Sequence, residues 1–237
     1  MQGARALVQV LVESGVRHVF GLPGDTGMAF YDALREQRNE IDHIMTRDER
    51  SASYMADVYA RVSGRLGVCE GPSGGGATYI VPGVAEAQGS AIPLLCLTSD
   101  TPVDQHGRGV LTELDQEGLF RPVSKWNTRV NSAATMAEAT RRAIRMATVG
   151  RPGATHLSLP TDALEGETPD ESVYGVPEFG AAPALRVVPD QALLERAAAE
   201  LGAAERPVIV AGGGVLTSGA WNELTALAER LNIPVAT

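Results

Sequence analysis

The residue best placed for chemistry in this sequence is Glu49, a carboxylate at the start of an amphipathic helix pattern. It follows the strand-like run 41–45 and precedes the helical pattern of residues 51–63. A strand end followed by a helix start brings a side chain to the carboxyl edge of a sheet, where open α/β folds bind ligands. In one interpretation Glu49 only stabilises the helix N-terminus, by roughly 0.3–1 kcal/mol. In the other it is a proton donor or hydrogen-bond partner in an apolar cleft.

Glycine-containing turns follow several of the expected strands. Residues 71–76 lie between a strand and a helix, and Pro23 and Gly24 end the first strand. A later strand is followed by a run of three glycines, Gly212, Gly213 and Gly214. Glycine lets the backbone approach a ligand closely, and amides at a helix start suit anionic atoms. The turn at 71–76 matches neither the Walker pattern nor a full G-x-G-x-x-G, and the alternative for each turn is a structural role in helix–sheet packing.

Helix and strand patterns alternate along residues 1–165, and such alternation is typical of a parallel sheet. We expect a doubly wound, mainly parallel α/β fold with helices on both faces of the sheet. Residues 99–114 are expected to be a loop. The expected helices are residues 4–14, 28–37, 51–63, 77–88 and 136–148, and the expected strands are 16–22, 41–45, 66–70, 93–98, 123–130 and 155–159.

The composition changes after the last of these strands, which indicates a second folded part. Residues 1–165 form the expected first domain, and residues 166–189, rich in proline, glycine and acidic side chains, are typical of a linker. Residues 190–237 give one further helix–strand–helix–strand pattern. A unit of that size buries only part of its apolar surface, so we expect it to be incomplete or completed by another chain.

The overall charge narrows the range of partners. The formal net charge is −9, which disfavours nucleic acid and anionic membranes because no basic stripe can neutralise phosphates. No apolar stretch reaches the roughly 20 residues of a membrane span, and no signal peptide is visible, so the expected location is cytoplasmic. Cys69 and Cys96 lie in apolar runs and are expected to be reduced and buried. The four histidines show no metal-ligand spacing, so no metal site is predicted in this chain.

Several ordered motifs together point to a family. They are Gly-Val-x-x-Val-Phe-Gly-x-Pro-Gly at 15–24, Arg-x-Glu at 47–49, Met-Ala-Asp-x-Tyr-Ala-Arg-x-Ser-Gly at 55–64 and Ser-Gly-x-Gly-Ala-Thr at 73–78. In this order they resemble the N-terminal pyrimidine-binding domain of thiamine-diphosphate enzymes. The group most like it contains acetolactate synthase, benzoylformate decarboxylase and glyoxylate carboligase. The resemblance covers residues 1 to about 165, and the remainder is similar to the start of the group's central domain.

The resemblance implies a catalytic role for Glu49. In such enzymes this glutamate hydrogen-bonds N1′ of the cofactor's aminopyrimidine and so promotes removal of the proton from thiazolium C2. The implied reaction is decarboxylation or carboligation of a 2-oxo acid through a C2 ylide and an enamine. Glyoxylate carboligases lack the glutamate, which argues against that branch. The cofactor-binding residues implied in this chain are Pro23, Gly24, Glu49, Gly75, Gly76 and Tyr79.

Some positions depart from the family pattern. Pro72, Gly75 and Tyr79 stand where acetolactate synthases usually carry Thr, Pro and Asn, so contacts near the pyrimidine differ. Gln116 matches a family glutamine near the substrate. His106 lies in the long loop, where substrate contacts are expected.

The family's Gly-Asp-Gly motif, which with later asparagines holds the diphosphate and Mg²⁺, has no match in these residues. The resemblance places the cofactor between two subunits, so the expected partner is a second copy or a chain carrying the diphosphate-binding domain. Alone, the chain is expected to be inactive. Two alternatives remain. One is a non-catalytic interaction or regulatory module that keeps the fold. The other is nucleotide (FAD) binding through Gly212, Gly213 and Gly214, as flavin-binding synthases of this family do in their central domain.

Overall fold

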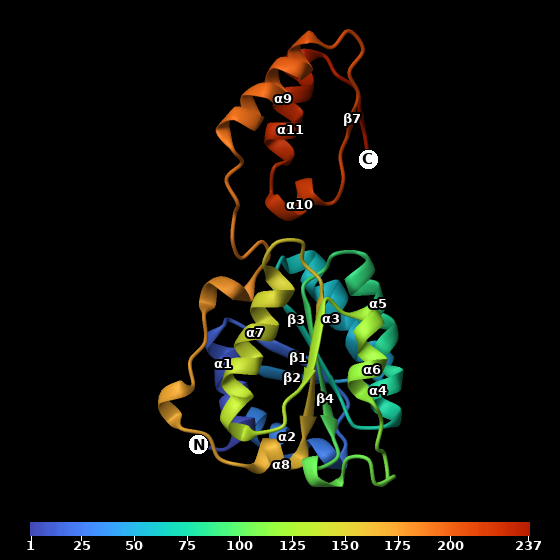
Figure 1. Ribbon diagram of the computed structural model, residues 1–237, viewed down its shortest axis with the longest axis vertical. Helices are drawn as coiled ribbons and strands as arrows, with labels where there is room; N and C mark the ends of the chain where they lie inside the picture. Colours follow the sequence, from blue (N-terminus) through green and yellow to red (C-terminus); the bar gives the residue numbers. More distant parts are fainter. The chain divides into compact units, whose positions relative to one another are not determined.

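The computed structural model describes all 237 residues, which form two compact units, Met1–Leu185 and Arg186–Thr237. The first unit contains a six-stranded sheet in the order β2-β1-β3-β4-β6-β5, and every neighbouring pair of strands is parallel (Figure 1). The predicted parallel α/β fold is therefore confirmed. The strands are β1 His18–Gly21, β2 Asp42–Met45, β3 Gly67–Gly71, β4 Leu94–Asp100, β5 Trp126–Arg129 and β6 Ala154–Pro160.

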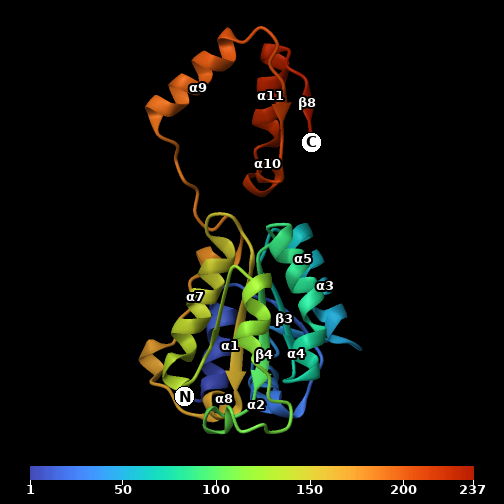
Figure 2. The same cartoon turned by 45° about the vertical axis from the view of Figure 1, so that its right-hand side comes forward.

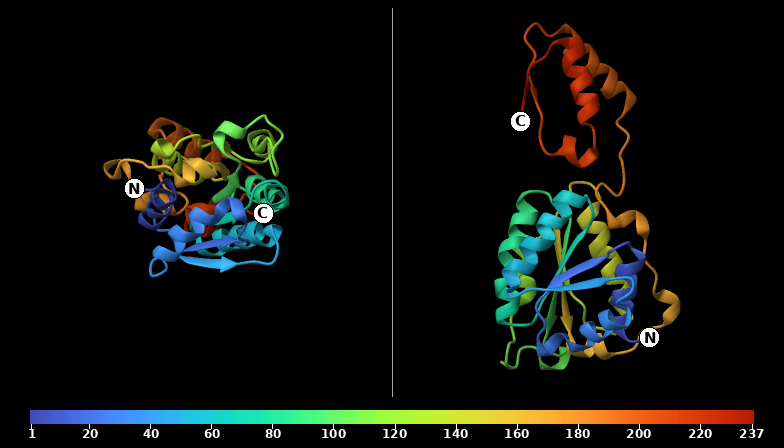
Figure 3. Two further views of the ribbon diagram at one scale, coloured as in Figure 1. Left: turned by 90° about the horizontal axis from the view of Figure 1, so that it is seen from below. Right: turned by 180° about the vertical axis from the view of Figure 1, so that it is seen from behind.

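Helices cover both faces of this sheet (Figures 1 and 2). One face packs against α1 Gly3–Glu13, α2 Met28–Glu36, α7 Met136–Thr148 and α8 Thr161–Glu165. The other face packs against α3 Glu49–Ser63, α4 Gly75–Tyr79, α5 Val81–Gly89 and α6 Gln116–Phe120. The right-hand view of Figure 3 shows the sheet between the two layers.

Burial explains why the sequence gives these elements. Every residue of β3, β4 and β6 is buried, because helices cover both faces of the inner strands. In α1 the residues Ala6, Leu7, Val10 and Leu11 are all fully buried, at the spacing of one helix face. Cys69 and Cys96 are free and buried, as the sequence predicts, and they lie opposite each other in the register of β3 and β4.

The connectivity of the sheet creates a crevice at its carboxyl edge. The chain leaves β1 for β2 at the edge of the sheet and then returns to form β3 on the other side of β1. The loops that follow β1 and β3 therefore lead to opposite faces of the sheet. Ligands bind at such a switch point in open α/β folds.

One expected helix is wrong. Residues 77–88 form two helices, α4 and α5, which meet at Ile80. Pro82 lies in the first turn of α5 and has no amide hydrogen, so it cannot continue the hydrogen-bond ladder from α4. Gly75 and Gly76, expected in the turn, already belong to α4. The expected loop at 99–114 is also shorter at its start, because β4 continues to Asp100.

Residues 166–185 pack against the first unit. The amide of Thr168 donates to the Met1 carbonyl at 2.8 Å, and the amide of Leu66 donates to the Gly180 carbonyl at 2.9 Å. Val173 is buried in the core. The boundary between the two units follows Leu185 and so falls inside the segment 166–189 that the composition assigns to a linker.

The second unit is small and open. It contains a two-stranded parallel sheet of β7 Ile209–Val210 and β8 Val235–Ala236, together with α9 Gln191–Ala203, α10 Gly214–Ser218 and α11 Trp221–Leu231. Ile233 is its one buried apolar side chain. Across both units, no helix combines the length and apolar character that crossing a membrane requires.

Candidate functional site

Glu49 is the first residue of α3, directly after the N-cap residue Asp48. The Asp48 carboxylate accepts a hydrogen bond from the Arg50 amide at 2.8 Å and pairs with the Arg50 guanidinium at 2.7 Å. These hydrogen bonds from Arg50 lower the pKa of Asp48 to about 2. Arg50 is thus paired with Asp48, while the Glu49 side chain turns inward and is only 8% exposed.

Glycines make the space that the Glu49 side chain occupies. A Cβ atom on Gly76 would lie 3.1 Å from Glu49 Oε1, and one on Gly71 would lie 3.4 Å from Glu49 Cγ. Gly76 and Gly24 both contact the ring of Pro72 so closely that neither could carry a side chain without displacing it. The turns after β1 and β3 therefore meet beside Glu49, as the switch point of the sheet requires.

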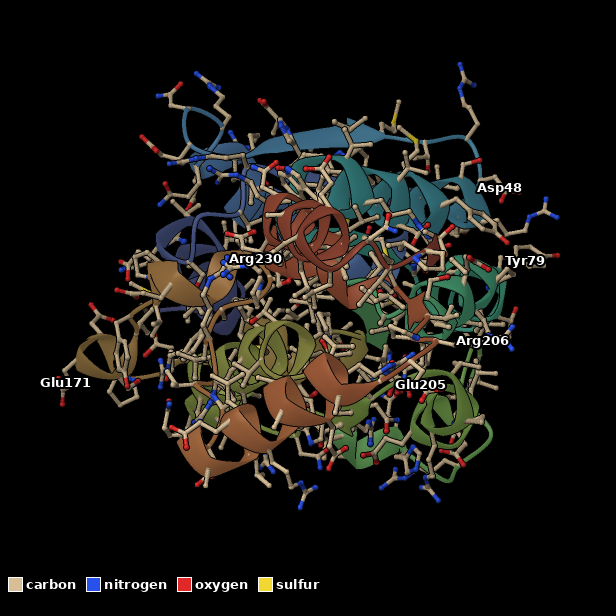
Figure 4. The ribbon with its side chains drawn as sticks, turned by 90° about the horizontal axis from the view of Figure 1, so that it is seen from above. Asp48, Tyr79, Glu171, Glu205, Arg206 and Arg230 are labelled. Carbon is tan, nitrogen blue, oxygen red and sulfur yellow. The ribbon has the colours of Figure 1, made fainter.

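The predicted residues Pro23, Gly75 and Tyr79 lie on the open side of this site. Pro23 is exposed, and no heavy atom comes within 4 Å of a Cβ built on Gly75. The Tyr79 side chain is exposed, and its ring centroid is 5.9 Å from the Arg50 guanidinium carbon. Figure 4 shows Tyr79 and Asp48 at the same edge of the first unit.

An apolar groove of about 860 Å³ begins at the same helix start. Its lining residues come from β1, the residue before α3 and the exposed side of α3 itself: Phe20, Asp48, Arg50, Ser51, Tyr54, Met55 and Val58. Tyr54, Met55 and Val58 are exposed, and the same helix carries Val62, which is 83% exposed. An exposed apolar helix face next to the buried carboxylate is suited to contact with another protein surface.

A chain of hydroxyl groups joins three loops at the carboxyl edge of the sheet. Thr26 Oγ1 donates to Ser73 Oγ at 3.2 Å and lies 2.7 Å from Ser99 Oγ. Ser73 Oγ in turn donates to Thr112 Oγ1 at 2.8 Å. The hydroxyl chain therefore fixes the loops after β1, β3 and β4 relative to one another.

Gln116 lies beneath this edge rather than on an open surface. Its side chain is buried, its Oε1 accepts a hydrogen bond from Thr98 Oγ1, and its Nε2 donates to the Ser99 carbonyl at 2.9 Å. Thr98 Oγ1 also lies 2.7 Å from Nε2 of His156, whose pKa burial lowers to about 3. Both the oxygen and the nitrogen of the Gln116 amide are therefore hydrogen-bonded within the fold. Gln116 thus holds the backbone at Ser99, near the end of β4.

His106 lies in the loop between β4 and α6 and is half exposed. Its Nδ1 is 3.7 Å from Glu113 Oε1. Glu113 organises the loop by accepting hydrogen bonds from the amides of Gly107, Gly109 and Val110. The structure brings Gly24, Gly76 and Glu49 together, but it gives His106 no contact with them.

The structure adds a buried carboxyl group close to Glu49, which the sequence interpretation missed. Glu70, on β3, is 2% exposed and accepts a hydrogen bond from the hydroxyl of Tyr31 on α2. Burial raises the pKa of Glu70 to about 8, the Tyr31 hydrogen bond opposes this rise, and the charge of Glu49 adds to it. The signal was present, because a charged residue near the end of the apolar run 66–70 is rarely buried without a partner.

The three glycines expected to form a nucleotide turn, Gly212, Gly213 and Gly214, all belong to the second unit. The expected turn is shorter than three residues, because Gly213 is the N-cap residue of α10 and Gly214 is already its first helical residue. The Gly213 carbonyl accepts a hydrogen bond from the Thr217 amide at 3.0 Å, which belongs to the first turn of that helix. A Cβ on any of the three glycines would meet no atom within 4 Å, so none of them is required by crowding.

No three His, Cys, Asp or Glu side chains lie close enough together in either unit to hold a metal ion.

Comparison with known families gives the class of this protein. A model described as the thiamine pyrophosphate enzyme N-terminal TPP binding domain matches residues 1–119. A second model, the thiamine pyrophosphate enzyme central domain, matches residues 194–237. The chain belongs to the thiamine pyrophosphate (thiamine diphosphate) enzyme family, and the resemblance drawn from its motifs is confirmed.

Three similar proteins are named as acetolactate synthase large subunits. A probable acetolactate synthase large subunit of Methanocaldococcus jannaschii is 41% identical over 239 residues, which cover 100% of this chain and 40% of the relative. A probable acetolactate synthase large subunit of Methanococcus aeolicus is also 41% identical, over 100% of this chain and 39% of the relative. The acetolactate synthase isozyme 1 large subunit of Escherichia coli is 34% identical over 98% of this chain and 40% of the relative. The chain thus spans about 40% of the length of these relatives.

Proposed function

We propose that this chain supplies the aminopyrimidine-binding half of a thiamine-diphosphate enzyme that decarboxylates or ligates 2-oxo acids. The observation that carries the proposal is the placement of Glu49. Its carboxylate is buried at the switch point of the sheet, and the absence of side chains at Gly71 and Gly76 lets the backbone after β3 approach it closely.

In this proposal Glu49 holds a proton at the N1′ atom of the pyrimidine. Bound thiamine diphosphate would supply a thiazolium C2 that loses its proton and attacks a carbonyl carbon. The burial of Glu49 strengthens its hydrogen bond, because a charge-assisted bond in a poorly solvated cleft is stronger than in water. The Arg50 guanidinium is paired with Asp48, so its ion pair is made with that residue and not with Glu49.

The glycine loop and the hydroxyl chain would position the ring. Gly24, Gly75 and Gly76 are proposed to lie against the pyrimidine, with Pro23 beside Gly24 and Tyr79 at the open rim. Thr26 and Ser73 support this wall, since their hydroxyls connect the turn after β1 to the turn after β3. His106 and Gln116 are proposed to act on the substrate side, Gln116 by holding the end of β4.

A second protein surface is proposed to complete the site and to hold the diphosphate with Mg²⁺. The apolar groove beside Glu49 supports this proposal, because it exposes Tyr54, Met55 and Val58 at the rim of the site. The partner would be a second copy of the protein or a chain that carries the diphosphate-binding domain. FAD binding through Gly212, Gly213 and Gly214 and a cytoplasmic location also remain predictions.

Calorimetry tests the proposal. Thiamine diphosphate with Mg²⁺ is titrated into this chain alone and into this chain mixed with a diphosphate-binding domain from a family member. Binding in the mixture that Glu49→Gln weakens, and that the exposed control Glu138→Gln leaves unchanged, supports the proposal. If a verified complex forms and no cofactor binds, the non-catalytic interaction module is the better account.

A further inference from the structure

Glu70 is a buried acid that the proposed chemistry does not use. It is the fourth of five residues of β3, and every residue of that strand is buried. Its Oε2 accepts a hydrogen bond from Tyr31, but its Oε1 is buried without any hydrogen-bond partner. An ionised carboxylate with an unpaired oxygen is far more costly to bury than a neutral carboxylic acid.

Two glycines make room for this carboxyl group. A Cβ on Gly21 would lie 2.7 Å from Glu70 Oε2, and a Cβ on Gly27 would lie 3.3 Å from Glu70 Oε1. Gly27 ends the short η1 helix Asp25–Gly27, which follows the turn that carries Gly24. Glu70 therefore lies directly under the backbone that forms one wall of the Glu49 site.

The residue after Glu70 contacts Glu49 itself. A Cβ on Gly71 would be 3.4 Å from Glu49 Cγ. Glu49 on α3 and Glu70 on β3 therefore both lie at the carboxyl end of β3, and the charge of Glu49 acts on Glu70. A like charge nearby disfavours the ionisation of Glu70, which is the more deeply buried of the two groups.

We propose that Glu70 is a positioning residue that stays a neutral carboxylic acid, bonded to Tyr31, and so supports the wall of the site beside the Glu49 carboxyl group. The role of Glu70 in catalysis rests on the proposed function. The neutral state of Glu70 and its coupling to Glu49 do not, and they can be tested in this chain without cofactor.

The groups that face Glu70 are consistent with this state. Tyr31 approaches from α2, and burial and the adjacent carboxyl both raise the pKa of its phenol, which remains a hydrogen-bond donor. His43 on β2 meets the Tyr31 ring edge-on with centroids 4.8 Å apart, and burial lowers the pKa of its imidazole. Cys96 on β4 is buried with a raised thiol pKa. No cation among these neighbours offsets a charge on Glu70.

The test is a carboxyl titration of the full chain without cofactor. Glutamate side-chain carboxyl carbons are labelled with ¹³C, and their NMR shifts are followed between about pH 4 and about pH 10. One signal that titrates near pH 8 is expected in the wild type and is expected to be missing in Glu70→Gln. Glu49→Gln should lower that midpoint by several tenths of a pH unit or more, because a like charge is removed. Tyr31→Phe should raise it, because the charged form loses its hydrogen bond.

The exposed control Glu138→Gln should leave the midpoint unchanged. The inference is overturned if no glutamate titrates above about pH 7, or if Glu49→Gln leaves the midpoint where it was. If Glu70→Gln does not fold, the changes of the titration midpoint in Glu49→Gln and Tyr31→Phe still test the inference. A chain that binds no cofactor contradicts the proposed function, but it leaves this titration, and the inference, standing.

The consequence for catalysis is read from a pH profile. In a cofactor-bound complex, exchange of the C2 proton should slow above about pH 8 in the wild type, as Glu70 ionises beside Glu49. Glu70→Gln cannot ionise, so its profile should lose this alkaline decline. A residue with only a packing role would change the rate without changing the shape of the profile.

Discussion

The identity of single residues decides how close the backbone comes to Glu49. Gly76 faces the Glu49 carboxylate and the ring of Pro72, whereas its neighbour Gly75 faces open space. Both residues lie in the first turn of α4 and neither has a positive φ angle. The two adjacent glycines therefore form a natural pair of test and control.

Gly76→Ala is expected to destabilise the fold by about 1–3 kcal/mol, because the new methyl group overlaps Pro72 and crowds Glu49. Gly75→Ala is expected to be neutral or slightly stabilising, since alanine favours a helix over glycine. Urea unfolding of both variants measures the difference. Equal stability of the two variants would contradict the close packing of Gly76 against Pro72 and Glu49.

The sequence indicates Glu49 but not its neighbour Glu70, and the reason is physical. A carboxylate at a strand-to-helix corner can be recognised from local pattern alone. The contact between Glu70 and Tyr31 joins residues 39 positions apart, and it depends on how α2 packs on β3. Gln116 shows the same limit, because its burial follows from α6, a five-residue helix that the sequence pattern does not reveal.

At the scale of elements, α3 carries the site, and both its ends are defined by specific residues. It begins at the Asp48 cap and ends at Gly64, which has a left-handed φ of +69°. No atom lies within 4 Å of a Cβ at Gly64, so its conformation rather than crowding demands glycine. The start of α3 can be predicted because strand, cap and carboxylate are adjacent in sequence. The break between α4 and α5 is harder to predict, because the apolar pattern of residues 77–88 is that of one continuous helix and only Pro82 indicates the break.

Gly64→Ala should destabilise the chain by about 1 kcal/mol, the cost of holding an alanine in the left-handed region. The matched control is Gly89→Ala at the end of α5, which has open space and no positive φ. This control should change the stability by less than about 0.5 kcal/mol. Thermal unfolding of the two variants gives the comparison. A tolerated Gly64→Ala would contradict the left-handed end of α3.

At the scale of the whole molecule, buried titratable groups link stability to pH. Glu70 keeps its proton in the folded chain up to about pH 8, while the unfolded chain releases it near its ordinary pKa of 4.5. Between these values the folded state binds more protons, so the contribution of Glu70 to stability falls as pH rises. His156 acts at the other end: burial lowers its pKa from 6.5 to about 3, and its contribution falls as pH drops through that range.

Urea unfolding of the wild type should therefore show lower stability at about pH 9 than at about pH 5, with up to about 4 kcal/mol arising from Glu70. Glu70→Gln should remove most of this difference, because glutamine does not titrate. The comparison between the two proteins cancels the general effect of the negative net charge. A wild type whose stability rises from about pH 5 to about pH 9 relative to Glu70→Gln would show that Glu70 is ionised in the fold.

The most direct measurement is the exchange rate of the thiamine C2 proton in a complex of this chain with a diphosphate-binding domain. We predict that exchange in the wild-type complex is at least about 100-fold faster than in Glu49→Gln, the range expected for a positioned acid–base group. Glu138→Gln, an exposed change on α7, should match the wild type. Equal exchange rates in wild type and Glu49→Gln, at equal cofactor occupancy, would contradict the assignment of Glu49 as the residue that activates the cofactor.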